Sequence, residues 1–566
     1  MFIHRIGRTT WLVTALVFSS PMLLPLAGRN KPKPQKLEEQ PESAAFSAIV
    51  DRIIANELQT RAKMHEFSPR VETYLQYYKP DNELGDVATS DDYFLGRLKF
   101  SKNVNEPAAE ESFTPDTNEE WFLRHPELLK VRLQLDQFAV QPLVVDETNF
   151  DRKHYAFHPV RWEYLGDVRC LAVDLEPRDL KARGVFEGRI WVEDHDYAIV
   201  RLNGTRINPR RWDFFFHFDC WRENLQPGVW LPVYIYSQET DRGKKLRYKA
   251  ETRFWGYDLT AHHQQQEWTS ILVDAPVAVR DTSDLKSDLT PVESQRQLNM
   301  DAEHNIIERL EKARLLAPPG PVDKVLETVV NNLRATNHLD NLPPVQCRVM
   351  LTSSLESFSL SYTIVLSRGL IDVLPDESSL AMVLAHELAH IALGQKLNAK
   401  YAFSDRMQVT DEQLLASLDI AKNLKDETAA DAKGIEFLKN SPYQDKLSHA
   451  GLFLRAASDV APHVPCLFGR HLGNGLTEGS NNKLMRMEAL ASAAPVLTPR
   501  NLDQIPALPL GARLQVDPWD GAVSFAVRKA DTLVDASEKM SFRVTPVIPY
   551  LRPYPQPKTS APAVNQ

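Results

Sequence analysis

Two histidines and a glutamate stand at a spacing that suits metal-assisted hydrolysis. His386 and His390 are four residues apart, and Glu387 directly follows the first, in the run His-Glu-Leu-Ala-His. On a helix, residues four apart lie on one face, so both imidazoles can reach one metal ion while the glutamate lies beside it. A carboxylate there can act as the base toward a metal-bound water. The spacing predicts a hydrolytic metal centre, and zinc is its usual ion.

The segment that carries these residues has the signals of a helix. Asp376 follows a proline and is a typical N-cap residue, and residues 380–393 contain neither glycine nor proline. The motif therefore falls in the middle of a predicted helix, where both histidines share a face. Two buried structural histidines are the alternative interpretation, and a third ligand would decide against it.

A second predicted helix offers that third ligand. Glu427 and Asp431 are four residues apart, and Ile435 and Leu438 continue the stripe of Asp431 at helical spacing. This pattern favours an inward-facing pair over a solvated acidic face. Catalytic zinc takes three protein ligands and one water, so Glu427 is predicted to be the third ligand. Asp431 is predicted to accept a hydrogen bond from the distal N–H of a ligand imidazole.

Together the two motifs resemble the gluzincin metallopeptidases of the HtpX, BepA-like and CAAX-protease type, over roughly residues 299–492. The resemblance implies a zinc endopeptidase with one Zn²⁺ per chain, in which Glu387 activates the zinc-bound water and Arg486 assists the transition state. It also implies an edge strand that pairs with the backbone of an extended substrate. The residues of that strand are Thr363, Ile364, Val365 and Leu366.

Three positions depart from the family pattern. Residues 356–358 read Glu-Ser-Phe where the family often has Asn-Ala-Phe, and Gln395 stands where it often has His. Residues 477–480 read Thr-Glu-Gly-Ser where a His-Pro pair is usual before the Arg. These departures leave the oxyanion-stabilising residue unassigned. They also keep open a second class of protein, a non-catalytic zinc-containing chaperone or lipoprotein-binding protein that uses an N-terminal β-sheet. Glu387 favours catalysis over this alternative, because a structural zinc ion needs no base.

The N-terminus has the pattern of a secretory signal. Arg5 and Arg8 precede residues 9–28, which carry no charge and contain an apolar run. Cleavage after Ala27 is expected; an uncleaved membrane anchor is the alternative, because Pro25 occupies a position that prefers a small residue. The expected location is the periplasm or the extracellular space. No later stretch approaches about 18 continuous apolar residues, so no further span is expected.

Composition agrees with an exported globular protein of two or three domains. The chain has 566 residues and a net charge of −9, and 43% of its residues are hydrophobic. The negative charge and the lack of a sustained basic patch exclude nucleic acid as a partner. The expected partner is a polypeptide substrate, with envelope lipoproteins or the membrane surface as further candidates. One disulfide per domain and buried thiols remain equal alternatives for the four cysteines. These are Cys170, Cys220, Cys347 and Cys466.

The predicted fold class is α+β, with an antiparallel β-rich N-terminal domain, a mainly helical zinc-metallopeptidase domain and a C-terminal β-hairpin. The β-rich prediction rests on short runs of β-branched and aromatic residues between turn signals. Residues 186–201 also have a more distant resemblance to the half-barrels of periplasmic lipoprotein-carrier proteins. The predicted segments are a signal peptide (1–27), a linker with a helical stretch (28–70), the β-rich domain (71–275), the metallopeptidase domain (290–495), the hairpin segment (496–545) and a Pro-rich tail (546–566).

Overall fold

A computed structural model describes the larger part of the chain, and contacts divide it into residues 1–48 and residues 49–566. The predicted signal peptide lies outside the described residues. None of the described helices is long and apolar enough to cross a membrane. The described residues are 43–81, 85–99, 108–110, 141–146, 148–207, 216–240, 246–257, 291–395, 424–469, 474–478, 483–484, 486–498, 504, 508–510, 514–516, 523–525 and 551–554.

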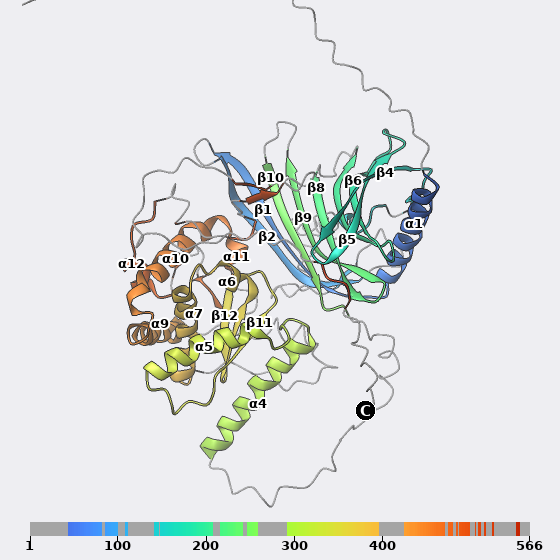
Figure 1. The fold of residues 1–566 in the computed structure, drawn as a ribbon. Coiled ribbons are helices and arrows are strands. Elements are labelled where there is room, and N and C mark those ends of the chain that lie inside the picture. The colour runs from blue at the N-terminus through green and yellow to red at the C-terminus, as the bar shows by residue number, and fades with distance from the viewer. Residues whose placement is uncertain are drawn as a thin grey trace, which may run out of the picture. The chain divides into compact units, whose positions relative to one another are not determined.

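One large antiparallel sheet forms the N-terminal half of the described fold (Figure 1). Its strand order is β3-β2-β1-β10-β9-β8-β7-β6-β5-β4, so β1 lies between β2 and β10. The predicted antiparallel β-rich region is confirmed. The strands are β1 (Arg70–Asp81), β2 (Gly85–Lys99), β3 (Ala108–Glu110), β4 (Tyr155–Leu165), β5 (Val168–Pro177), β6 (Val185–Glu193), β7 (Ile199–Ile207), β8 (Phe216–Gln226), β9 (Val229–Thr240) and β10 (Leu246–Trp255).

The predicted helical stretch before the sheet is α1 (Ala44–Met64). Its residue Glu57 forms a buried ion pair with Arg222 of β8, with oxygen–nitrogen distances of 2.6 and 2.7 Å. Removing one member of such a pair leaves an uncompensated buried charge, which costs several kcal/mol. This pair therefore fixes the second half of α1 against the sheet.

The region after residue 290 is mainly helical and contains a small four-stranded sheet with the order β11-β13-β12-β14. β11 and β13 are parallel, and the other two pairs are antiparallel. The elements are α4 (Pro291–Lys312), α5 (Pro321–Thr336), β11 (Gln346–Met350), β12 (Glu356–Leu360), β13 (Thr363–Ser367), α6 (Arg368–Val373), α7 (Glu377–Ala392), α9 (Leu424–Lys439), α10 (Leu447–Val460), α11 (Pro465–Phe468), β14 (Asn474–Gly475) and α12 (Glu488–Ala493).

Two short hairpins follow in the chain. β15 (Thr477–Glu478) pairs with β16 (Lys483–Leu484), and β17 (Leu514–Val516) pairs with β18 (Val523–Phe525), which confirms the predicted C-terminal hairpin. Of the Pro-rich tail, only residues 551–554 are described. Leu551 there is buried in an apolar cluster, and its carbonyl accepts a hydrogen bond from Asp167 N at 2.9 Å. At least this part of the tail is therefore packed on the sheet.

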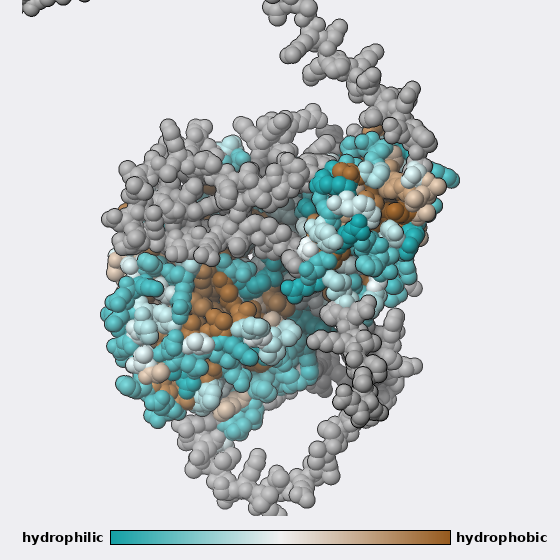
Figure 2. All heavy atoms as spheres, viewed as in Figure 1, coloured by the Kyte–Doolittle hydropathy of each residue, from teal (hydrophilic) through white to brown (hydrophobic). Residues whose placement is uncertain are grey.

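The main apolar core lies around α7 and includes a residue of the large sheet. Leu384 of α7 and Phe437 of α9 are fully buried in the same cluster as Tyr74 of β1. A second cluster joins Leu95 of β2 to Ile306 of α4. On the face drawn in Figure 2, apolar residues of the helical region are framed by hydrophilic ones. All four cysteines are free thiols, so the structure contains no disulfide between them.

Candidate metal centre

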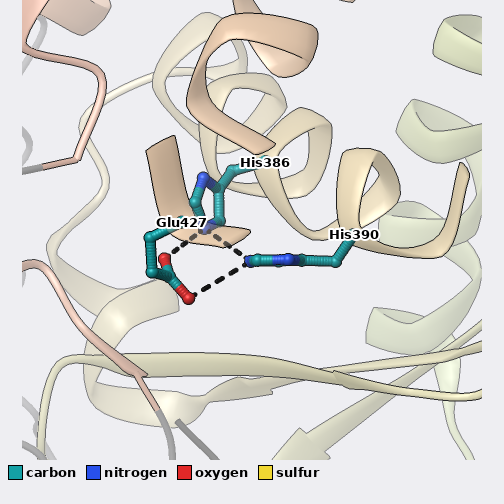
Figure 3. A group of neighbouring side chains, drawn as sticks. All are labelled: His386, His390 and Glu427. Atoms are coloured by element: carbon teal, nitrogen blue, oxygen red, sulfur yellow. Dashed lines mark hydrogen bonds and ion pairs between the residues drawn. The ribbon is translucent and has the colours of Figure 1, made fainter. Parts of the chain in front are cut away.

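Three side chains from two helices converge on one point (Figure 3). The Nε2 atoms of His386 and His390 lie 3.1 Å apart, and Glu427 oxygens lie 3.1 Å from the first and 3.4 Å from the second. Two ligands bound about 2.05 Å from a tetrahedral zinc ion lie about 3.3 Å apart. The spacing of the three side chains therefore fits a single tetrahedral ion with one position left open.

Local sequence explains why the helices meet here. Asp376 accepts a hydrogen bond from Ser379 N at 2.8 Å, so α7 begins where the N-cap pattern predicts. α9 approaches α7 at Gly434, where a side-chain carbon would lie 3.2 Å from the backbone of Ala385 and 2.7 Å from Met487 Cε. A small residue is needed at that position. The two helices can then face each other closely enough to share a metal ion.

Each histidine is oriented by a partner on its other ring nitrogen. His386 Nδ1 lies 2.8 Å from Asp431 Oδ1, as the sequence predicts for Asp431. His390 Nδ1 is hydrogen-bonded to Gln395 Oε1, while Gln395 Nε2 donates to Asp426 O at 3.2 Å. A hydrogen on each Nδ1 leaves each Nε2 with a free lone pair. Both imidazoles thus present the correct nitrogen to a metal ion.

The charges of the centre suit a cation. Burial lowers the pKa of His386, but hydrogen bonds to Asp431 and Glu427 outweigh this and raise it above its ordinary value. Burial raises the pKa of Glu427, but hydrogen bonds from His386 and His390 hold it well below its usual range. The ligand carboxylate is therefore ionised.

The predicted base and the predicted arginine lie side by side. Glu387 is fully buried on α7, and its Oε1 accepts a hydrogen bond from Ser357 Oγ at 2.6 Å. Arg486 Nη1 donates to the same hydroxyl at 3.0 Å and lies 3.9 Å from Glu387 Oε1. A further guanidinium nitrogen lies 3.9 Å from Glu427. Arg486 therefore places its positive charge within 3.9 Å of both carboxylates.

The predicted edge strand is an inner strand. Residues 363–366 belong to β13, which pairs with β11 on one side and with β12 on the other. The prediction that this strand is open to a substrate is wrong, because both of its hydrogen-bonding edges are occupied. Its β-branched, apolar residues are typical of a buried inner strand. The strand next to the metal centre is β12, which also pairs with β14 through Glu356 and Ser357.

Sequence reasoning did not assign a role to Ser357 or Gln395, which contact Glu387 and His390. Both lie at positions where the sequence departs from the pattern of the family it resembles. The signals in the sequence are the polar side chain of Ser357 where that family often has Ala, and the amide of Gln395 where it often has His. Departures next to a site can mark new contacts as well as lost ones.

The site combines a helix carrying His-Glu-x-x-His, an acidic ligand from a second helix and a small sheet beside them. This combination defines a metallopeptidase. Residues 322–410 match the model of peptidase family M48. The matched segment includes His386, Glu387 and His390 and ends before Glu427. This agrees with the resemblance carried by the first motif. No curated protein is significantly similar to the chain.

Two solved structures are similar to part of the chain. A LolA superfamily protein from Nitrosomonas europaea is 11% identical, with 37% of this chain and 91% of that chain covered and a TM-score of 0.18. A DUF1329 family protein from Desulfovibrio piger is 12% identical, with 38% and 93% covered and a TM-score of 0.21.

Proposed function

We propose that this chain is an exported zinc-dependent metalloendopeptidase that hydrolyses peptide bonds of extended or misfolded envelope proteins. The supporting observation is the convergence of His386, His390 and Glu427 at ligand distances, with Glu387 buried beside them. When bound, zinc would polarise the scissile carbonyl and lower the pKa of a bound water. A structural zinc site would have no use for a buried carboxylate next to its ligands.

The residues around the centre have separate tasks in this reaction. Glu387 accepts a proton from the attacking water and passes it to the leaving amine. Arg486 supplies positive charge within 3.9 Å of both carboxylates and stabilises the oxyanion that forms. Asp431 and Gln395 hold the two imidazoles in place. Burial of both histidines strengthens these charge interactions, because little water reaches them.

Two observations support the substrate and the location. β12 lies next to the base through Ser357. Among the described strands, β14 covers the outer edge of β12 only at Glu356 and Ser357, so residues 358–360 offer backbone groups on that edge to an extended polypeptide. Export is supported by the N-terminal sequence, in which two arginines precede an uncharged apolar stretch.

The decisive experiment compares the chain lacking residues 1–27 with its Glu387→Gln variant. We expect one zinc ion per chain in both proteins, cleavage of unfolded casein by the wild type, and a loss of about a hundredfold to ten-thousandfold in the variant, which lacks the base. Glu436→Gln, an exposed glutamate on α9, is the matched control and should cleave normally. Equal cleavage by Glu387→Gln would contradict the proposed role of Glu387. One zinc ion without cleavage in any protein would favour the binding-protein alternative.

A further inference from the structure

The hydroxyl of Ser357 stands between the base and the arginine. It donates to Glu387 Oε1 at 2.6 Å and accepts from Arg486 Nη1 at 3.0 Å. All three side chains are buried, with Arg486 the most exposed of them at 5%. A hydroxyl can donate one hydrogen bond while accepting another, so Ser357 satisfies both neighbours at once. Neither an alanine nor a second cation could do this.

The second carboxylate oxygen of Glu387, Oε2, is in a different situation from Oε1. Oε2 is buried and has no hydrogen-bond partner among the described residues. A buried polar atom without a hydrogen-bond partner is costly, and such an atom in a native fold calls for an explanation. Because Ser357 occupies Oε1, Oε2 is the oxygen that remains for the proton of the attacking water.

The same hydroxyl keeps the arginine away from the base. The guanidinium nitrogen that bonds to Ser357 lies 3.9 Å from Glu387 Oε1, too far for a direct hydrogen bond. Without the hydroxyl, both groups lose a partner in a buried place. A direct charge-assisted hydrogen bond between Glu387 and Arg486 would give each of them a partner again. Such a bond is shorter and stronger than a hydrogen bond to a neutral hydroxyl. That bond would turn the carboxylate and withdraw electron density from the base.

We propose that Ser357 is a positioning residue that orients Glu387 for proton transfer and prevents a direct hydrogen bond between Glu387 and Arg486. This inference rests on the proposed function, since it assigns the oxygen through which the proposed base works. Ser357 acts through Glu387 and does not itself contact the ligand atoms in the described structure.

The test uses the chain lacking residues 1–27 with Ser357→Ala, Ser357→Thr as the conservative variant, and Ser359→Ala as control. Ser359 is a buried serine two residues further along β12, with no role in the proposed centre. Zinc content, kcat and KM on unfolded casein are measured for each protein. We expect Ser357→Ala to keep zinc and KM and to lose about tenfold to a hundredfold in kcat. Ser357→Thr should recover most of that loss, and Ser359→Ala should match the wild type.

A second readout does not depend on activity. Crystal structures of zinc-loaded wild type and Ser357→Ala report the orientation of the Glu387 carboxylate. We expect the carboxylate to turn in the variant and to bond directly to Arg486. An unturned carboxylate, or an unchanged kcat in an active enzyme, would overturn the positioning role and leave the proposed function standing. Absence of cleavage by the wild type would refute the proposed function, while the two crystal structures would still decide the role of Ser357.

Discussion

Asp431 joins two parts of the centre that come from distant stretches of sequence. One oxygen bonds to His386 Nδ1, and the other accepts a hydrogen bond from Met487 N at 2.7 Å. Met487 follows Arg486 and has a φ of 51°, a left-handed conformation that is uncommon outside glycine. A single carboxylate therefore orients a ligand and also fixes the turn that presents the arginine.

The amide of Gln395 gives a prediction for metal affinity. Gln395→Ala removes the hydrogen-bond partner of His390 Nδ1, so the ring loses its fixed tautomer and orientation. Loss of such a partner typically weakens metal binding about 10–100-fold. Competition with a chromophoric chelator measures the change, and Gln444→Ala, an exposed glutamine, is the control. Identical zinc affinity in Gln395→Ala and wild type would contradict the assignment.

At the scale of elements, α7 brings together most of what the centre needs. Its N-cap, both histidines and the base lie on one helix without an internal glycine or proline. Asp376 accepts hydrogen bonds from Ser379 N and Ser378 Oγ, both at 2.8 Å, and lies 3.2 Å from His449 Nδ1. The start of the helix is thereby tied to α10.

The N-cap predicts a stability that depends on pH. Burial raises the pKa of Asp376, but hydrogen bonds from Ser379 and Ser378 outweigh this, and the net pKa is below its ordinary value of 3.8. The ionised cap therefore stabilises the fold above pH 3.8, and this contribution is lost as the pH falls through the lower pKa of the folded state. We expect Asp376→Ala to lower the free energy of unfolding by about 1 kcal/mol at pH 7.

Denaturant unfolding at several pH values measures this difference. The gap between wild type and Asp376→Ala should be constant above about pH 5 and should narrow below pH 3.8. Asp459→Ala, an exposed aspartate on α10, should show little change at any of these values. A gap that widens in acid would show that the sign of the pKa shift is wrong.

The parts of the site that could be predicted from sequence are the local ones. The spacing of His386 and His390 and the pair Glu427 and Asp431 follow from helical periodicity within each segment. The place of β13 could not be predicted, because strand order depends on pairing between segments that are distant in the chain. The contact of Ser357 with Glu387 depends on the same long-range pairing, through β12.

At the scale of the whole molecule, the large sheet and the helical region share buried contacts. Glu72 of β1 is 1% exposed and accepts hydrogen bonds from Ser353 N at 2.6 Å and Ser353 Oγ at 2.7 Å. Tyr93 OH donates to the same carboxylate at 2.6 Å. Ser353 lies just before β12, which carries Ser357. The sheet therefore supports the segment that leads to the base.

Breaking this contact should destabilise the fold. Glu72→Ala leaves the backbone N–H of Ser353 and two hydroxyl groups without their acceptor in a buried place, which we expect to cost about 2–4 kcal/mol of unfolding free energy. Urea unfolding followed by circular dichroism measures it. Glu176→Ala, an exposed glutamate of β5, is the control and should change the midpoint little. Equal midpoints for Glu72→Ala and wild type would show that the contact adds no stability.

The buried position of Leu551 has a consequence for the order of folding. Its side chain completes a cluster that contains Trp191, Trp221 and Trp230, which are encoded more than three hundred residues earlier. The apolar surface of these strands is fully covered only after the segment around Leu551 has been made. Until residue 551 has been added, the nascent sheet lacks part of the cover over these tryptophans, and exposed apolar surface of this kind invites aggregation or chaperone binding.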